Sequence, residues 1–293
     1  MSDAAAMTPV TRLGLQIPNF TFPGVADADL FETIAGIATT AENHGFDSLW
    51  VMDHLYQIGV VGPREDPMLE AYSLLSAVAA RTTSAALGTM VTGVTYRNPA
   101  LLAKIVTTLD VISSGRAILG IGAAWNDDEH AGYGYDFPTA KERLDRLEEA
   151  LQICRAMFTE QAPTFEGRYS RIRSVLNNPK PIRGRIPILI GGSGEKRTLR
   201  LVAQYADACN VFGAPDGVRH KLEVLERHCA DVGRDPAEIT KTTLLTARDP
   251  GAAADMLAAY VSVGVDGVVV NMPDVADLDK VAQTGETLRK VLA

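Results

Sequence analysis

Short apolar runs and segments with helical periodicity alternate eight times along the chain, and this alternation restricts the fold more than any other feature. Apolar runs bounded by turn signals predict buried parallel strands, and apolar residues spaced by three and four predict helices. The predicted strands are residues 13–17, 48–52, 86–92, 117–121, 186–190, 208–212, 239–244 and 267–270. The predicted helices are residues 28–44, 70–82, 99–113, 139–158, 195–206, 216–232, 250–263 and 274–291.

Eight β/α units in 293 residues match the usual size of a (β/α)₈ barrel. The alternative is an open doubly wound sheet, which rarely needs eight parallel strands. We therefore predict an α/β protein with a single TIM-barrel domain over residues 1–293, of which residues 1–10 are disordered. No Pro/Ser/Gly-rich linker divides the chain.

Two insertions interrupt the regular spacing. Residues 125–139, after strand four, read as a polar loop that helps to roof the pocket. Residues 159–185, before strand five, contain a small predicted hairpin at 164–169 and a proline-rich stretch at 178–181 that prevents regular structure. We expect this second insertion to cover one rim of the barrel.

Composition excludes several classes of partner. The 28 basic and 36 acidic side chains give a net charge of −8, which argues against binding to nucleic acid or anionic membranes. No apolar stretch reaches the roughly twenty residues of a membrane span. The first ten residues lack the pattern of a signal peptide, and Cys154, Cys209 and Cys229 read as buried free thiols, so we expect a cytoplasmic protein.

An acid and an imidazole, Asp53 and His54, directly follow the second predicted strand. The carboxyl ends of parallel strands open into loops that hold ligands. Histidine exchanges a proton near neutral pH, and a neighbouring carboxylate can orient the ring or raise its pKa. The pair is therefore a candidate catalytic site; the alternative is a loop-capping Asp beside a packed His.

A glycine-rich loop, Gly191-Gly192-Ser193-Gly194, follows the fifth predicted strand and opens a helix. Glycines allow close approach of the backbone to a phosphate, and the first N–H groups of a helix point at an anion. Lys196 and Arg197 would add positive charge. We favour a phosphate site over a simple tight turn.

Two further segments carry weaker signals. Small residues along 88–95 indicate close approach of another backbone or a flat ligand, and Asn98 before Pro99 reads as a helix cap. After Trp125 and Asn126, the run from Asp127 to His130 has three acids and a histidine. Adjacent acids on a loop are typical of a solvated surface, so we predict no metal site.

Together these segments resemble the bacterial luciferase-like family, and within it the branch of F420-dependent oxidoreductases of actinobacteria. The resemblance is carried by residues 50–54, 88–100, 114–126 and 190–194 and covers roughly residues 11–270. It implies a barrel that holds a flavin or deazaflavin ring at its carboxyl-terminal mouth. It also implies a non-prolyl cis peptide at Met90–Val91.

The same resemblance assigns roles to single residues. Asp53 and His54 would contact the ring or the reacting centre, and Met90, Val91 and Thr92 would support the ring. Asn126 would lie beside the ring. The residues that would hold the phosphate are Gly191, Gly192, Ser193 and Gly194.

Two departures from the family pattern bear on the substrate. Sugar-phosphate dehydrogenases of this family have a glutamate three residues before the position of Asn126, where this chain has Ala123. They also have a tryptophan four residues after the histidine, where this chain has Ile58. Both differences argue against oxidation of glucose 6-phosphate.

The choice of cofactor rests on the family resemblance and on the basic side chains available to bind it. Coenzyme F420 and FMN share a tricyclic ring, ribityl chain and phosphate, but F420 adds an oligoglutamate tail that needs cations. The candidates, expected on the rim of the mouth, are Lys180, Arg183, Arg185, Lys196 and Arg197. We therefore expect hydride transfer between F420 and a small organic substrate. The alternatives are an FMN-dependent monooxygenase and a carrier or sensor without turnover.

The substrate pocket is expected to be mainly apolar. Its predicted lining is Gln16, Pro18, Tyr56, Met68 and Trp125. Family members are often dimers, so a homodimer is expected.

Overall fold

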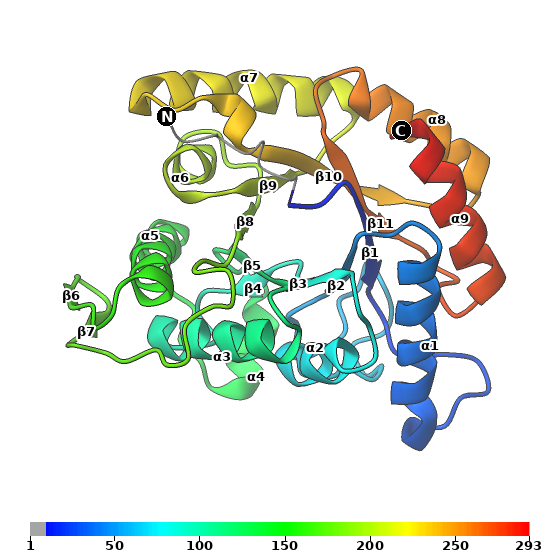
Figure 1. Ribbon diagram of the computed structural model, residues 1–293, viewed down its shortest axis with the longest axis horizontal. Coiled ribbons are helices and arrows are strands. Elements are labelled where there is room, and N and C mark those ends of the chain that lie inside the picture. The colour runs from blue at the N-terminus through cyan, green and yellow to red at the C-terminus, as the bar shows by residue number, and fades with distance from the viewer. Residues whose placement is uncertain (1–9, 293) are drawn as a thin grey trace.

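All eight predicted strands are present, and they close into a parallel barrel (Figure 1). The computed structural model describes residues 10–292. The barrel strands are β1 (Leu13–Ile17), β2 (Ser48–Val51), β3 (Ala86–Thr89) with β4 (Thr92–Gly93), β5 (Ala117–Gly122), β8 (Ile188–Gly191), β9 (Ala208–Val211), β10 (Thr240–Thr246) and β11 (Gly267–Asn271). The order β3-β2-β1-β11-β10-β9-β8-β5 is closed by pairing of β3 with β5.

Helices surround the barrel, as Figure 1 shows. They are α1 (Leu30–Asn43), α2 (Ala71–Ala79), α3 (Pro99–Ile112), α5 (Ala140–Thr159), α6 (Thr198–Tyr205), α7 (Pro215–Val232), α8 (Pro250–Val261) and α9 (Leu278–Val291), with short 3₁₀ turns η1 (Asp27–Asp29) and η2 (Pro236–Glu238). The predicted cap is confirmed at α3, where the Asn98 side chain accepts from the backbone N–H groups of Ala100 and Leu101. No helix within residues 10–292 combines the length and apolar character needed to cross a membrane.

Side chains fill the barrel interior around Trp50. The inward-facing cluster comprises Trp50, Met90, Ile118, Leu189, Ala208 and Val269. Glycines make room for the indole: a Cβ at Gly88 would lie 2.7 Å from the Trp50 ring, and one at Gly14 would lie 2.5 Å from its Nε1. The indole N–H is satisfied by Ser48 Oγ at 2.9 Å. These contacts explain the small residues on the first and third strands.

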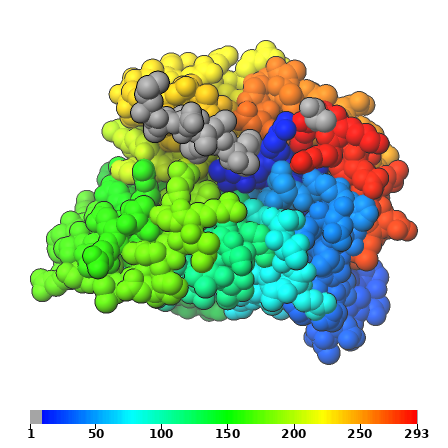
Figure 2. Space-filling view, in the orientation of Figure 1, coloured from blue at the N-terminus to red at the C-terminus, as the bar shows by residue number. Residues whose placement is uncertain are grey.

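The first and last helices close the ring. In Figure 2 the blue segment of α1 lies against the red segment of α9, and the two helices pack together. The prediction of disorder for residues 1–10 lies outside the described residues except for Val10. The backbone N–H of Val10 donates to Thr240 Oγ1 at 3.2 Å.

The prediction of a loop over residues 125–139 is wrong for its first half. Residues Asp127–Tyr133 form a short helix, α4, which ends at Gly134 with φ of 72°. The left-handed conformation at Gly134 ends a helix at low steric cost. The helix is important for the site because it buries Glu129 and His130.

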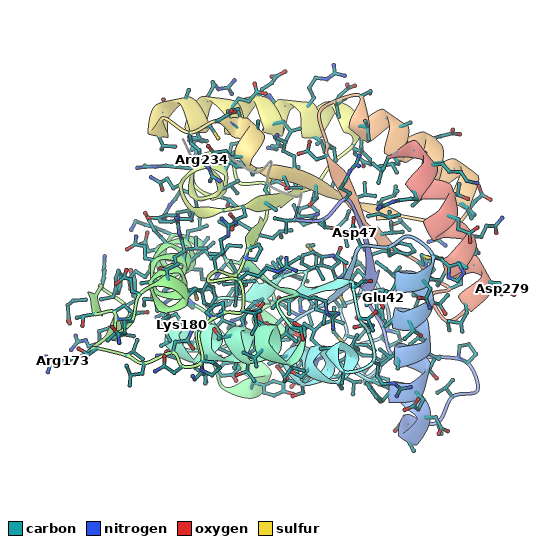
Figure 3. The ribbon with its side chains drawn as sticks, viewed as in Figure 1. Glu42, Asp47, Arg173, Lys180, Arg234 and Asp279 are labelled. Carbon is teal, nitrogen blue, oxygen red and sulfur yellow. The ribbon has the colours of Figure 1, made fainter. Side chains whose placement is uncertain are left out.

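The connection between α5 and β8 carries a hairpin of β6 (Phe165–Glu166) and β7 (Arg171–Ile172). Glu149 of α5 holds its turn by accepting from the backbone N–H groups of Arg168, Tyr169 and Ser170. The hairpin lies on the outer side of α5, and Arg173 points away from the barrel (Figure 3).

Candidate functional site

A cavity of about 300 Å³ opens at the carboxyl ends of the barrel strands. Seven of the predicted site residues line it: Asp53, His54, Met90, Val91, Thr92, Gly191 and Gly192. Ala123 and Trp125 line it as well. The remaining lining residues were not assigned to the site from the sequence: Gly93, Tyr96, Gly122, Ala124, Thr198, Phe212 and Leu244. Three predicted residues, Asn126, Ser193 and Gly194, do not line this cavity.

The third strand is interrupted beneath this cavity. The Met90–Val91 peptide bond is cis, as the family resemblance implied, and it separates β3 from β4. The Val91 side chain lies between two glycines. A Cβ at Gly122 would be 2.8 Å from Val91 Cγ2, and one at Gly191 would be 2.9 Å from Val91 Cγ1. Glycine is therefore required at Gly122 on β5 and at Gly191 on β8 for the Val91 side chain to fit.

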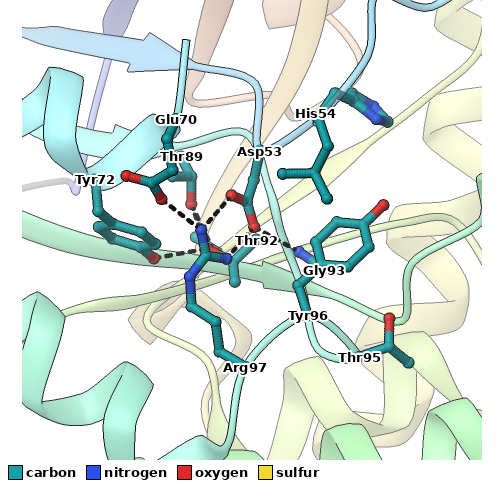
Figure 4. A network of polar contacts seen from close by, with 12 residues as sticks. Asp53, His54, Glu70, Tyr72, Thr89, Thr92, Gly93, Thr95, Tyr96 and Arg97 are labelled. Carbon is teal, nitrogen blue, oxygen red and sulfur yellow. Dashed lines mark hydrogen bonds and ion pairs between the residues drawn. The ribbon is translucent and has the colours of Figure 1, made fainter. Parts of the chain in front are cut away.

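Asp53 is buried and bound to Arg97, as Figure 4 shows. Arg97 binds both carboxylate oxygens, at 2.7 and 2.9 Å, and also Glu70 at 2.6 Å. The backbone N–H of Gly93 donates to Asp53 Oδ2 at 3.2 Å. Burial raises the pKa of Asp53, whereas Arg97 and the Gly93 N–H oppose this by stabilising the carboxylate. Both carboxylate oxygens of Asp53 are thus used, in bonds to Arg97 and to the Gly93 N–H of β4.

His54 pairs with a different carboxylate, that of Glu129. In Figure 4 the His54 imidazole turns away from Asp53, and its Nδ1 lies 2.9 Å from Glu129 Oε2. Glu129 also accepts from the backbone N–H groups of Leu55 and Tyr56 and from the Tyr96 hydroxyl. An ionised carboxylate only accepts, so Nδ1 carries the proton. Nε2, which has no hydrogen bond within residues 10–292, is then available as a base.

Glu129 is fully buried, so the interpretation of residues 127–129 as a solvated acidic surface is wrong for this residue. Burial raises the pKa of Glu129, but the hydrogen bonds from His54, Tyr96 and the backbone outweigh it, and the net pKa is lowered. Conversely, burial and the adjacent Glu129 carboxylate raise the pKa of Tyr96. The site therefore contains a stable carboxylate, a neutral tyrosine and an oriented imidazole.

Trp125 lies just before α4, and His130 lies on α4 directly after Glu129. The Trp125 ring meets the His54 ring edge-on, with centroids 5.4 Å apart. His130 is buried between Thr95 Oγ1, at 2.7 Å, and the Asn126 carbonyl, at 2.6 Å. Asn126 itself starts α4. Both nitrogens of His130 are thus used, so it acts as a structural residue.

The glycine-rich loop reaches the cavity wall with Gly191 and Gly192, and Ser193 follows directly outside the lining. Ser193 Oγ accepts from the backbone N–H of Phe212 at 2.9 Å, which leaves its own O–H to donate. The helix after the loop begins at Thr198, not at residue 195 as predicted, and Thr198 lines the cavity. The prediction for Arg197 is corrected, because Asp145 binds its guanidinium at 2.6 Å. The exposed Lys196 has no ion pair within the described residues.

The prediction of a continuous basic rim is also wrong. Lys180 donates to the carbonyls of Met157 and Glu160 at the carboxyl end of α5, and Arg185 pairs with Asp207, just before β9. Arg183 lies beside Gly115, which precedes β5. These three side chains therefore lie at the amino ends of the strands, opposite the cavity.

Within residues 10–292 no group of three or more His, Cys, Asp or Glu side chains could hold a metal ion.

The comparisons with known proteins agree with this geometry. The model of the luciferase-like monooxygenase family matches residues 11–292. An uncharacterized protein of Mycobacterium tuberculosis is 28% identical over 255 residues, which cover 83% of this chain and 88% of that protein. The F420-dependent glucose-6-phosphate dehydrogenase of Segniliparus rotundus is 34% identical over 209 residues, which cover 69% of this chain and 60% of that enzyme.

Among solved structures, an F420-dependent secondary alcohol dehydrogenase, in complex with an F420-acetone adduct, has the same fold. The TM-score is 0.80 at 19% identity, and the alignment covers 97% of this chain and 99% of the other. The family match extends over nearly the whole chain. The chain therefore belongs to the luciferase-like monooxygenase family.

Proposed function

We propose that this protein is an oxidoreductase that transfers a hydride between coenzyme F420 and a small organic substrate, with His54 carrying the accompanying proton. One observation carries the proposal: the wall of the mouth cavity holds an imidazole whose Nδ1 is bound to a buried carboxylate, Glu129. Such a pair fixes the tautomer and leaves Nε2 to exchange a proton with substrate.

The cavity has the features that a phosphorylated tricyclic cofactor needs. Met90, Val91 and Thr92, from the interrupted third strand, line the cavity and can support a ring. Ser193 and Thr198 offer hydroxyl groups, and the start of α6 adds backbone N–H groups for a phosphate. When bound, the deazaflavin supplies the hydride chemistry, and the protein supplies orientation and exclusion of water. The relatives named for F420 favour this cofactor over FMN.

The substrate of the curated relatives is not proposed for this chain. Ala123 lines the cavity where a proton-donating glutamate would be needed. Here the carboxylate beside the histidine is supplied by Glu129, six residues later. Glu129 accepts hydrogen bonds and has a lowered pKa, so it orients His54 and does not donate a proton.

A parallel titration of the purified protein with F420 and FMN tests the proposal. Trp125 lines the cavity and is 61% exposed, whereas Trp50 is buried, so quenching of Trp125 fluorescence reports ligand binding. We expect tight binding of F420, weak binding of FMN, and loss of the signal in Trp125→Phe. Preferential binding of reduced FMN with rapid oxygen consumption would instead support a monooxygenase.

Replacement of His54 by Ala distinguishes an enzyme from a carrier. We expect the variant to bind F420 like the wild type but to lose hydride transfer. Unchanged activity together with unchanged F420 binding in this variant would contradict the assignment of His54 and favour a carrier or sensor.

We also propose that the protein is a homodimer in the cytoplasm. Exposed apolar side chains occur on α3 and on the connection between α5 and β8, which is bonded to α3: Leu101, Val111, Ile112, Leu176 and Ile182. The three cysteines are buried and free, as is usual in a reducing compartment. Light scattering of the purified protein and fractionation of cells test these two points.

A further inference from the structure

A second cavity, of about 360 Å³, adjoins the mouth cavity, and the two share His54 and Tyr96 as wall residues. The second cavity is otherwise lined from the loop after β2 and from the end of α4, by Met68, Tyr133 and Tyr135 among others. Each cavity separately has the size of a small-molecule site. The proton-exchanging imidazole thus stands at the boundary between them.

The charged groups of this second cavity are already paired. Arg97 is bound by Asp53 and Glu70, and Glu70 also accepts from the backbone N–H of Ser73. An anionic ligand would have to compete with two carboxylates for one guanidinium. A cationic ligand would have to displace Arg97 from the same carboxylates. The electrostatics therefore favour a neutral ligand.

Aromatic rings form one wall. Tyr133 and Tyr135 are stacked, with an interplanar angle of 9° and centroids 6.3 Å apart, and Tyr135 lies 5.8 Å from Tyr96. Both outer tyrosines are about half exposed, and their hydroxyl groups make no hydrogen bond within residues 10–292. Flat rings pack against such a wall, and the free hydroxyl groups can bind a polar substituent.

We propose that the second cavity binds the body of the substrate, and that this substrate is a neutral, flat aromatic or conjugated alcohol, interconverted with its carbonyl compound. This inference rests on the proposed function. In the oxidative direction, the carbinol carbon gives its hydrogen and two electrons as hydride to oxidised F420. The hydroxyl proton passes to His54 Nε2, and the carbon–oxygen bond becomes a carbonyl. The protonated imidazole then returns its proton to solvent.

The orientation of His54 agrees with this assignment. Glu129 fixes Nδ1, so that Nε2 is the nitrogen free to take the hydroxyl proton. Tyr96 lines both cavities, and its hydroxyl donates a hydrogen bond to Glu129 Oε2 at 2.7 Å. Tyr96 therefore positions the pair and contributes its ring to the aromatic wall.

Calorimetric titration with two probes tests the inference. Cinnamyl alcohol is neutral, flat and conjugated, whereas cinnamate has the same ring with a negative charge. We expect the wild type to bind cinnamyl alcohol at least about tenfold more tightly than cinnamate. Equal or tighter binding of cinnamate, or no binding of the alcohol, would overturn the proposal.

Variants locate the binding. The double variant Tyr133→Ala, Tyr135→Ala should bind cinnamyl alcohol about tenfold more weakly, with its affinity for F420 unchanged. Tyr205→Ala is the matched control, because Tyr205 belongs to α6 and bonds to Gln152 outside both cavities. Wild-type affinity for the alcohol in the double variant would overturn the assigned site.

The F420 titration on the same samples separates the two proposals. If the alcohol binds in a tyrosine-dependent way but F420 does not bind, the cofactor assignment fails and the neutral aromatic site stands. If F420 binds and the alcohol does not, the proposed function stands and the substrate class is wrong.

Discussion

Replacement of Glu129 by Gln should detach His54 from its orienting partner with little change in shape. The glutamine can retain one oxygen for the backbone N–H groups of Leu55 and Tyr56. Its amide nitrogen would then face His54 Nδ1 and the Tyr96 hydroxyl. It cannot accept a hydrogen bond from either, so the His54 proton should move from Nδ1 to Nε2.

The size of the stability loss follows from two hydrogen bonds to the charged Glu129, one from His54 Nδ1 and one from the Tyr96 hydroxyl. Each is worth about 1.5–3 kcal/mol, and the amide partly replaces them by donating to Nδ1 and to the tyrosine oxygen. We expect a loss of about 2–4 kcal/mol in the free energy of unfolding. Because Nε2 can no longer accept a proton, kcat should fall by about 10²–10⁴-fold. The affinity for F420 should remain within about threefold.

Imidazole nitrogen NMR measures the tautomer directly, without a known substrate. The chain has only five histidines, so the His54 signals can be assigned with one His54→Gln sample. We expect the Nδ1–H form in the wild type and the Nε2–H form in Glu129→Gln. An unchanged tautomer, or a variant with wild-type kcat, would refute the role of Glu129.

Stability against pH provides a second signature. The pKa of Glu129 is lowered in the fold from an ordinary value of 4.5. A depressed pKa contributes stability that is present above the unfolded-state value and is lost as the pH falls through the folded-state value. The stability difference between wild type and Glu129→Gln should thus be full at pH 7 and shrink below about pH 4.5.

Glu42 provides the matched control. It accepts from the backbone N–H groups of Thr83, Ser84 and Ala85 before β3, and these bonds outweigh burial and lower its pKa to about 2. Glu42→Gln should lose stability with the same pH dependence, fading from about pH 4.5 towards pH 2, but it should leave kcat unchanged. An equal loss of kcat in this control would mean that Glu129→Gln acts only through stability.

Three further variants test the rest of the site. Asp53→Asn should cost about 3–5 kcal/mol in the free energy of unfolding, because it leaves the buried Arg97 with Glu70 as its remaining carboxylate partner. Chemical denaturation measures this loss, and a value below about 1 kcal/mol would contradict the role of the buried ion pair. Gly191→Ala should abolish F420 quenching, because its Cβ would lie 2.9 Å from Val91, whereas Gly217→Ala in α7, with no atom within 4 Å, should bind normally. Lys196→Ala should weaken binding of F420 but not of its tailless deazaflavin, and equal weakening of both would place the tail elsewhere.

Much of the fold could be predicted because each element depends on local periodicity. The strand ends also placed Asp53, His54 and the glycine loop at one mouth, since parallel strands present their carboxyl ends together. The same rule shows why the basic rim was misplaced. The connection between α5 and β8 enters a strand at its amino end, so Lys180, and the arginines after it, lie on the opposite face.

Glu129 could not be predicted in this way. Its partner His54 is 75 residues away in the sequence, and three consecutive acids have no periodicity that distinguishes a buried member. The distinction arises only when Asp127–Tyr133 coil into α4, which turns Glu129 inward and leaves Asp127 and Asp128 exposed. The one sequence signal for this short helix was Gly134, a residue type that often ends helices.

Asp53 and His54 are adjacent just after the end of β2, but Asp53 binds Arg97 and His54 binds Glu129. The two hydrogen-bond networks are connected. Asp53 holds the backbone N–H of Gly93, the Gly93 carbonyl accepts from the backbone N–H of Tyr96, and the Tyr96 hydroxyl donates to Glu129. Glu129 then orients His54. Because this chain of bonds leads from Asp53 back to its own neighbour, we expect the buried ion pair of Asp53 to affect proton exchange at His54 without contacting the imidazole. Asp53→Asn leaves Glu129 to fix the tautomer of His54, so we expect imidazole NMR to show the Nδ1–H form in this variant, but we expect kcat to fall as well as stability, which a purely structural ion pair would not cause.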